Sequence, residues 1–168
     1  MALSGTVRLV LAKLVAELEY PMYVVTAAAR GERSGCLVGF GTQTSIHPER
    51  FLACISRKNH TLPVASGAEL LAVHFLSDDA EERALAELFG GETGDETDKF
   101  ELCAWHEGPG GVPLLDEVPN RFVGRALERL DLGDHVGFLL DPIDAEKGDG
   151  FDELGFQETK EIEPGHPA

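Results

Sequence analysis

Apolar residues follow two different periods along the first part of the chain. In residues 6–19 they recur at helical spacing, which predicts an amphipathic helix that packs by one face and ends before Pro21. Residues 22–28 are β-branched and aromatic and predict a strand, which a turn follows at residues 30–33. Residues 35–43 predict a second strand that is unusually rich in glycine. The chain thus begins with a helix and then changes to strands.

The middle of the chain alternates short strands with short helices. Residues 51–56 and 70–76 have the apolar composition of buried strands. Between them a short helix is predicted to begin near Thr61, with a proline in its first turn. Asp78 and Glu81 resemble a capping box, so we predict another helix there, which ends at two glycines.

Three further strands are predicted after an acidic loop at residues 92–98. They lie near residues 101–106, 121–130 and 133–140, and a stretch rich in glycine and proline separates the first two. Six or seven short strands with a few helices predict a mainly β fold, and more specifically a β-barrel with flanking helices.

Composition divides the chain into two unequal parts. Residues 1–145 are expected to form one domain. Residues 146–168 are acidic and contain many glycines and prolines, so we expect a peripheral tail. Phe151, Leu154 and Phe156 are the tail residues suited to docking on the body or on a partner subunit.

The charge of the chain limits its partners. Its 168 residues include 30 acidic and 14 basic side chains, for a formal net charge of -16. Such a surface repels phosphate backbones and anionic membranes, so neither nucleic acid nor a membrane is an expected partner. A site for an anionic cofactor has to concentrate positive charge locally.

The cysteines point to a reducing compartment. Cys36, Cys54 and Cys103 are odd in number and contain no C-x-x-C pair, which indicates reduced thiols and a cytoplasmic protein. The apolar N-terminal region is interrupted by charges such as Arg8 and Lys13, so we expect neither a signal peptide nor a membrane span.

One candidate site combines the glycine-rich strand with the basic loop at residues 57–61. Gly39 and Gly41 leave room for a flat ring system to approach the backbone. The loop supplies hydrogen-bond donors, and a helix that starts at Thr61 adds free N–H groups, which suit a phosphate. The alternative is a barrel-corner glycine pattern beside an ordinary polar turn, and the pattern alone favours that alternative.

The histidines give weaker signals. His135 follows Asp134, which can set its tautomer beside a redox ring, but a surface histidine at a turn is the simpler alternative. Cys103 and His106 have the spacing of half a zinc site, but no second pair lies nearby, so no metal site is expected. His47 and His74 are interpreted as structural. Motifs for a P-loop, a Rossmann fold or a serine or zinc hydrolase are absent from the sequence.

Taken in order, these segments resemble the flavin reductase-like family, which has the FMN-binding split β-barrel fold. The resemblance covers about residues 20–140. It rests on the V-T strand end at residues 24–26, the GCLVGFGTQTSIHPE segment at 35–49, the polar loop 56–61, LAVHFL at 71–76, Phe89, Lys99-Phe100 and the G-D-H of residues 133–135. The chain departs from the family pattern at Leu37, Phe40, His47 and Glu49, where the family has Thr, Ser, Asp and Pro.

The resemblance implies a role for each of these segments. The isoalloxazine ring and ribityl chain would face Leu37, Val38, Gly39, Phe40, Gly41 and Thr42. The phosphate would be held by Ser56, Arg57, Lys58, Asn59, His60 and Thr61. Phe89, Lys99 and Phe100 would line the site, and His135 would be the catalytic residue near the nicotinamide or the flavin edge.

The implied activity is NAD(P)H-dependent reduction of FMN or FAD by hydride transfer. The resemblance also implies a homodimer, and some members of the family supply reduced flavin to the monooxygenase of a two-component system. Two alternatives stay open at this stage. One is a split-barrel flavoprotein that oxidises or reduces another small substrate, and the other is a non-catalytic flavin-binding module.

Overall fold

The computed structural model describes residues 5–91 and 97–163. Its strands are β1 Tyr23–Ala29, β2 Glu32–Val38, β3 Gly41–Ile46, β4 Glu49–Ser56, β5 Leu70–Phe75, β6 Trp105–Glu107, β7 Pro113–Leu115, β8 Arg121–Asp131 and β9 His135–Glu146. Its α-helices are α1 Gly5–Ala16, α2 Thr61–Gly67, α3 Ala80–Gly91 and α4 Phe156–Thr159, and two 3-10 turns lie at Lys99–Glu101 and Pro109–Gly111.

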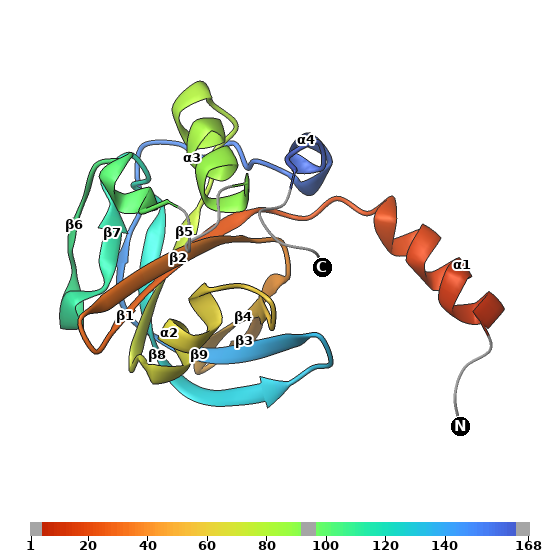
Figure 1. Cartoon of the computed structure of the whole chain (residues 1–168), viewed down its shortest axis with the longest axis horizontal. Coiled ribbons are helices and arrows are strands. Elements are labelled where there is room, and N and C mark those ends of the chain that lie inside the picture. Colours follow the sequence, from red (N-terminus) through yellow and green to blue (C-terminus); the bar gives the residue numbers. More distant parts are fainter. Residues whose placement is uncertain (1–4, 92–96, 164–168) are drawn as a thin grey trace.

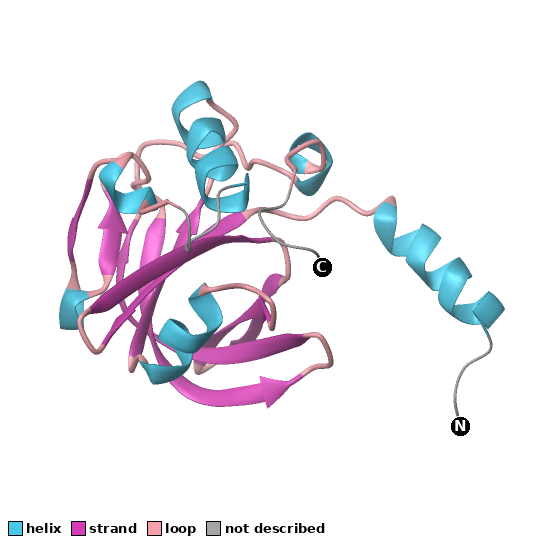
Figure 2. Cartoon of the chain, in the orientation of Figure 1, coloured by secondary structure: helices cyan, strands magenta, loops and turns pink. Residues whose placement is uncertain are grey.

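Seven strands form one antiparallel sheet in the order β2-β1-β5-β8-β9-β4-β3, and β6 pairs with β7 in a separate ribbon. The large sheet curls around α2, while α3 and α4 lie outside it (Figure 1). Figure 2 shows how strongly strands outweigh helices in the body of the molecule. The prediction of a mainly β barrel with a few flanking helices is therefore confirmed.

The predicted strand at residues 35–43 is two strands, not one. β2 ends at Val38 and β3 begins at Gly41, because the chain has to pass from one edge of the sheet to the other between them. The connection is tight at Gly39, where an added Cβ would lie 3.1 Å from the Tyr20 ring. The next residue of the connection, Phe40, is held on β4, because its backbone oxygen accepts a 2.9 Å hydrogen bond from the Cys54 N–H.

The end of β9 and the start of α3 also differ from the prediction. β9 continues to Glu146, which pairs with Arg121 at the start of β8, so the last strand extends beyond its predicted end at residue 140 and reaches the first residue of the predicted tail. The cap of α3 lies one residue later than predicted, because Asp79 accepts from the Glu82 N–H and Glu82 accepts from the Ser77 N–H. The short strand β7, in the region rich in glycine and proline, was not predicted.

Three apolar clusters are buried in the described residues, the smallest of them around Val112 and Val123, and the two larger ones hold most of the body together. One fills the barrel and includes Val25, Ile55 and Phe138, with Val64 and Ala65 of α2 packed into it. The other lies between the outer face of β1 and β2 and helix α3, and includes Leu85 and Phe89. Because α3 covers this face, it fixes one wall of the region where β2 ends.

The N-terminal helix behaves differently from the prediction. α1 forms, but all of its residues are exposed and it projects away from the body (Figure 1). The expected packing by one face is therefore not met within the chain. Across the described residues, the helices are too short or too polar to cross a membrane.

The C-terminal segment lies against the body. Leu154 is fully buried; its backbone oxygen accepts from the Met22 N–H and its N–H donates to the Leu76 oxygen. Gly155 forms an isolated β-bridge with Pro21. The C-terminal segment is thus docked on the body through Leu154, Thr159 and Ile162. The last part of the predicted tail, residues 164–168, lies outside the described residues, as do residues 92–96 of the predicted acidic loop.

Candidate functional site

A cavity of about 440 Å³ opens where the end of β2 faces the end of β4, strands that are not neighbours in the sheet. Helix α3 and the C-terminal segment complete its walls. Eight of the residues predicted to bind a cofactor or to act in catalysis line it: Leu37, Val38, Gly39, Phe40, Ser56, Asn59, Phe89 and His135. We call it the β2–β4 cavity.

The backbone of β2 is one reason why a flat polar ring can bind here. β2 is an edge strand, so the peptide groups on its outer side are not used in the sheet. Cys36 to Gly39 line the cavity along this edge. Outward-facing N–H and C=O groups can therefore meet the polar rim of a heterocycle without a specific side chain.

A row of aromatic side chains forms one side of the cavity. Phe156 stacks on Tyr20, with ring centroids 4.7 Å apart and an angle of 17° between the planes. Tyr20 in turn lies 6.2 Å from Phe40, and Phe40 lies 4.9 Å from His135. Aromatic rings at these separations favour the addition of another flat ring.

His135 stands at the end of this row, where β9 begins. Its Nδ1 lies 2.7 Å from a carboxylate oxygen of Asp134. This hydrogen bond holds the pKa of Asp134 below its ordinary value. Its Nε2 makes no hydrogen bond with a described residue, and it is the ring atom left to meet a ligand.

The start of α2, predicted to hold a phosphate, has its Thr61 donors engaged by other residues of the chain. Thr61 is buried, its hydroxyl lies 2.8 Å from that of Ser34, and its N–H donates to the side-chain oxygen of Asn59 at 2.9 Å. The donors of Thr61 are therefore used within the fold.

The two basic residues of the loop, Arg57 and Lys58, do not line the cavity. The Arg57 guanidinium donates to the carbonyl oxygen of Gly133 at 2.7 Å and to the carboxylate of Asp131 at 2.6 Å. This contact lowers the pKa of Asp131. Lys58 is not among the lining residues and lies close enough to Asp134 to lower that pKa as well. These cations stabilise the β8–β9 turn.

Gly41 and Thr42 are likewise absent from the lining, because they belong to β3, on the far side of β4. Gly41 packs against Tyr23 and Phe51, and the Thr42 side chain is exposed.

The remaining predicted residues line a second cavity, of about 360 Å³. His60, Lys99 and Phe100 belong to it, together with Arg33 at the start of β2. Lys99 is buried, and its ammonium donates to the backbone oxygen of Phe89 at 3.1 Å. Since the Phe89 ring lines the β2–β4 cavity, the two cavities are adjacent.

The structure adds residues that the sequence pattern did not indicate. Tyr20 and Met22 come from the segment before β1, and Phe156, Thr159, Lys160 and Ile162 come from α4 and the residues after it. Among the described lining residues, Lys160 is the one with a fully charged cationic side chain, and its ammonium bonds the side-chain oxygen of Gln157 at 3.0 Å. The apolar residues in the acidic tail were the available sequence signal for this contribution.

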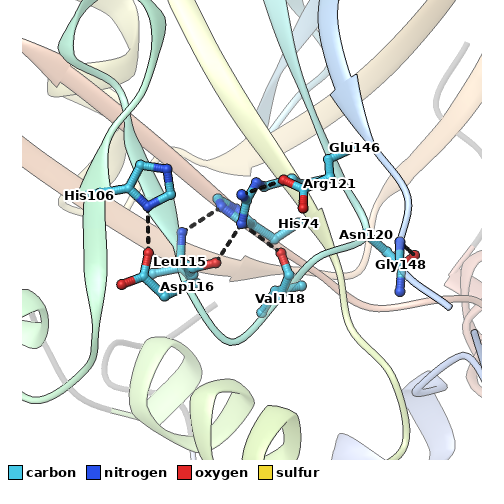
Figure 3. A network of polar contacts seen from close by, with 9 residues as sticks. All are labelled: His74, His106, Leu115, Asp116, Val118, Asn120, Arg121, Glu146 and Gly148. Atoms are coloured by element: carbon cyan, nitrogen blue, oxygen red, sulfur yellow. Dashed lines mark hydrogen bonds and ion pairs between the residues drawn. The ribbon is translucent and has the colours of Figure 1, made fainter.

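The histidine and cysteine pairs give no metal centre in the described part of the chain. His106 contacts Asp116 instead of Cys103, and burial among carboxylates raises the pKa of the Cys103 thiol to about 11. His74 is buried in a structural network (Figure 3). Its Nδ1 lies 3.0 Å from the Val24 oxygen, and its Nε2 accepts from the Leu115 N–H at 3.1 Å.

These features fit a phosphorylated flavin. The volume lies within the range of about 300–1,000 Å³ that is usual for small-ligand sites. The wall is apolar and aromatic along one side and has backbone groups along the other, and Ser56, Asn59 and Lys160 are polar side chains in its lining.

Comparison with known proteins agrees with a flavin as the ligand of this chain. The family model "Flavin reductase like domain" matches residues 15–160. The chain is 29% identical over 140 residues to the 4-hydroxyphenylacetate 3-monooxygenase reductase component of Pseudomonas aeruginosa, covering 81% of each chain. It is 23% identical over 131 residues to the ferric-chelate reductase (NAD(P)H) of Archaeoglobus fulgidus, covering 77% of each.

Solved structures give the fold. The NADH:FAD oxidoreductase of Streptomyces globisporus C-1027 superposes with a TM-score of 0.79 and 21% identity, over 93% of this chain and 92% of that one. The flavin reductase HpaC, solved with NADP+, superposes with a TM-score of 0.77 and 19% identity, over 90% and 94%. The split-barrel fold expected from the sequence is confirmed.

Proposed function

The chain belongs to the flavin reductase-like domain family, and on that premise we propose that it is an NAD(P)H-dependent flavin reductase that transfers hydride to FMN or FAD. The observation that carries the proposal is the β2–β4 cavity, in which an exposed strand edge faces a row of aromatic rings that ends at His135. The relatives named as reductases of the same activity class support it.

Hydride acceptance is the chemistry that a flavin supplies when it is bound. The chain has to bind and orient the two nucleotides, and to exclude water from between their rings. We assign the ring-binding role to the segment from Leu37 to Phe40, whose backbone meets the polar edge of the ring. Tyr20 and Phe156 close the apolar side. His135 holds the nicotinamide or moves a proton through its Nε2.

The residues that we propose to bind the phosphate differ in part from those predicted in the basic loop. Ser56 and Asn59 remain from the predicted loop, and Lys160 replaces Arg57 and Lys58 as the cation. An ammonium at the cavity wall offsets the strongly negative field of the chain where the phosphate binds.

We also propose a homodimer in which α1 packs on a second copy. The apolar side chains of α1 are exposed. Leu9, Leu11 and Leu14, and also Leu18 just after the helix, are each more than half exposed. A helix this short and this apolar is not stable alone in water, so it needs a partner surface. The described body does not cover it, which leaves a second copy as the natural partner.

Two finer assignments follow from the relatives and the cysteines. The reductase component of 4-hydroxyphenylacetate 3-monooxygenase suggests that this chain supplies reduced flavin to a partner monooxygenase. The three cysteines are free thiols, which suits a cytoplasmic protein.

An absorbance titration with FMN and with FAD, followed by addition of NADH and NADPH, tests the proposed activity. We expect saturable binding of at least one flavin and steady oxidation of the nicotinamide nucleotide when free flavin is in excess. A protein that binds neither flavin and oxidises neither nucleotide contradicts the proposal and favours a binding module.

A second candidate activity is reduction of another acceptor by a tightly held flavin. The relative named ferric-chelate reductase is the observation that favours it. In the same assay, a ferric chelate would then sustain nucleotide oxidation with one equivalent of flavin, and excess free flavin would add nothing.

A further inference from the structure

The barrel has a third cavity at the end remote from the β2–β4 cavity. Its volume is about 510 Å³. It is lined by Phe51 near the start of β4 and by the end of β9, whereas the β2–β4 cavity is lined by the end of β4 and by His135 at the start of β9. The two cavities therefore lie at opposite ends of the same two strands, and a flavin in the first does not occupy the second.

Four phenylalanines from separate segments make up its apolar wall, so we call it the phenylalanine cavity. Phe51, Phe75 and Phe122 meet with centroid distances of 5.3–6.0 Å. Phe151, in the segment after β9, approaches Phe75 edge-on at 6.4 Å and is 42% exposed. A further aromatic ring can make the same edge-to-face contacts, and its entry would remove apolar surface from water.

The charged side chains on the rim favour an anion. Arg50, Arg121 and Lys147 line the cavity, against the single carboxylate of Glu146. Asp141 also pairs with Arg50 from outside the lining, so the three cations exceed the neighbouring carboxylates by one, in a chain whose net charge is -16.

Arg50 uses one of its three guanidinium nitrogens in hydrogen bonds with described residues. Its Nη1 donates to the Glu49 oxygen and to the Asp141 carboxylate, both at 2.6 Å. Its Nε and Nη2 make no hydrogen bond with a described residue. A guanidinium presents these nitrogens as a fork that matches a carboxylate.

Arg121, in contrast, is already engaged. Its Nη1 donates to the backbone oxygens of Leu115 and Val118, and its Nη2 contacts Glu146 at 2.6 Å (Figure 3). Asn120 is also engaged, since its side chain bonds the backbone of Gly148. The wall around the start of β8 is thus fixed before any ligand binds.

We propose that the phenylalanine cavity binds a small aromatic carboxylate, with the ring among the four phenylalanines and the carboxylate on Arg50. The site is separate from the proposed flavin site and does not depend on flavin binding.

Titration of the full chain with phenylacetate, followed by calorimetry and by ¹H–¹⁵N NMR, tests this proposal. We expect saturable binding, with the largest amide shifts around Arg50, Phe122 and Lys147, both in the presence and in the absence of saturating FMN. Shifts confined to residues 36–40, or abolished by FMN, would place the ligand in the β2–β4 cavity and overturn the proposal. Absence of binding would also overturn it.

Variants separate the ring contact from the charge contact. Arg50→Gln should weaken phenylacetate binding about tenfold and leave binding of the neutral phenylacetamide unchanged. Phe151→Ala, at an exposed position, should weaken both. Arg83→Gln removes an exposed arginine paired with Asp78, away from the cavity, and should change neither. Equal loss of both ligands in Arg50→Gln, with Phe151→Ala unaffected, would contradict the assignment.

Discussion

The ring of Phe156 lies almost parallel to the ring of Tyr20, with centroids 4.7 Å apart, although 135 residues separate them in the chain. The contact is supported by a hydrogen bond from the Phe156 N–H to the Tyr20 oxygen at 2.9 Å. It brings the C-terminal segment to the end of β2 and gives the β2–β4 cavity both its aromatic side and Lys160. The acidic end of the chain is therefore part of the candidate site.

Loss of this ring pair should open the cavity. Phe156→Ala removes a partly buried aromatic side chain, so we expect a loss of about 1–2 kcal/mol in the free energy of unfolding and flavin affinity lowered about fivefold. Phe156→Leu keeps apolar volume but not the stack, and should recover most of the stability but less of the affinity. Urea denaturation and absorbance titration give the two quantities. Unchanged affinity in Phe156→Ala would separate the C-terminal segment from the site.

Lys160 should bind the flavin phosphate, and Arg57 should not. Lys160→Gln removes the ammonium at the cavity wall, and we expect about tenfold weaker binding of FMN, which corresponds to about 1.4 kcal/mol. Arg57→Gln is the matched control, because its guanidinium is engaged by Asp131 and Gly133. It should change affinity by less than about twofold. The reverse order of effects would restore the basic loop as the phosphate site.

The sequence predicted the barrel well where strands are buried and less well elsewhere. β1 and β5 are runs of apolar residues, and their positions were predicted closely. The second half of β9 was missed, because Asp141, Pro142 and Asp144 lack the alternation of a half-buried strand. They form strand because β8 offers a continuous partner, a tertiary contact that local composition does not encode.

The candidate site was also predictable only where its residues belong to local sequence patterns. Leu37 to Phe40 and His135 lie within local patterns, and the structure brings them to one cavity. Thr61 was expected to face a ligand, but it bonds Ser34 from β2, a contact between segments that only the fold brings together. Lys160 carries no local signal, since the role that we propose for it depends on docking of the C-terminal segment through the Phe156 ring.

Phe40, where the family pattern has serine, should contribute to binding of the nicotinamide nucleotide. Its ring is 52% exposed and lies 4.9 Å from His135, in line with the aromatic row. Phe40→Ser should raise the KM for NADH about tenfold with little change in kcat, because stacking at the mouth stabilises the bound and transition states alike. Leu102→Ser removes an apolar side chain that is 63% exposed and lies outside the cavity, and it should leave both constants unchanged. A fall in kcat alone would contradict this role for Phe40.

His74 should make the fold sensitive to mild acid. It is buried and neutral, and burial lowers its pKa from 6.5 to about 4. Between these values the unfolded chain binds a proton that the folded chain does not, so stability is full above about pH 6.5 and falls as the pH approaches 4. The contribution is about 3 kcal/mol over that window. Urea denaturation at pH 7 and pH 5 measures it.

A His74→Gln variant is the comparison for this effect. It keeps a polar side chain beside the Val24 oxygen and the Leu115 N–H but cannot titrate. We expect lower stability than the parent at pH 7 and a clearly smaller loss between pH 7 and pH 5. An equal loss in parent and variant would assign the acid sensitivity to the carboxylates instead.

The exposed apolar face of α1 should hold two copies of the chain together. Leu11 and Leu14 are 55% and 60% exposed, so their replacement by glutamate removes little packing within one chain. The double variant should keep the unfolding transition of the body but dissociate to monomers in sedimentation velocity at micromolar concentration, because buried charge opposes association. Lys13→Glu changes the charge of the same helix without removing an apolar side chain, and should remain dimeric. A parent chain that is monomeric, or a double variant that stays dimeric, would show that α1 does not form the interface.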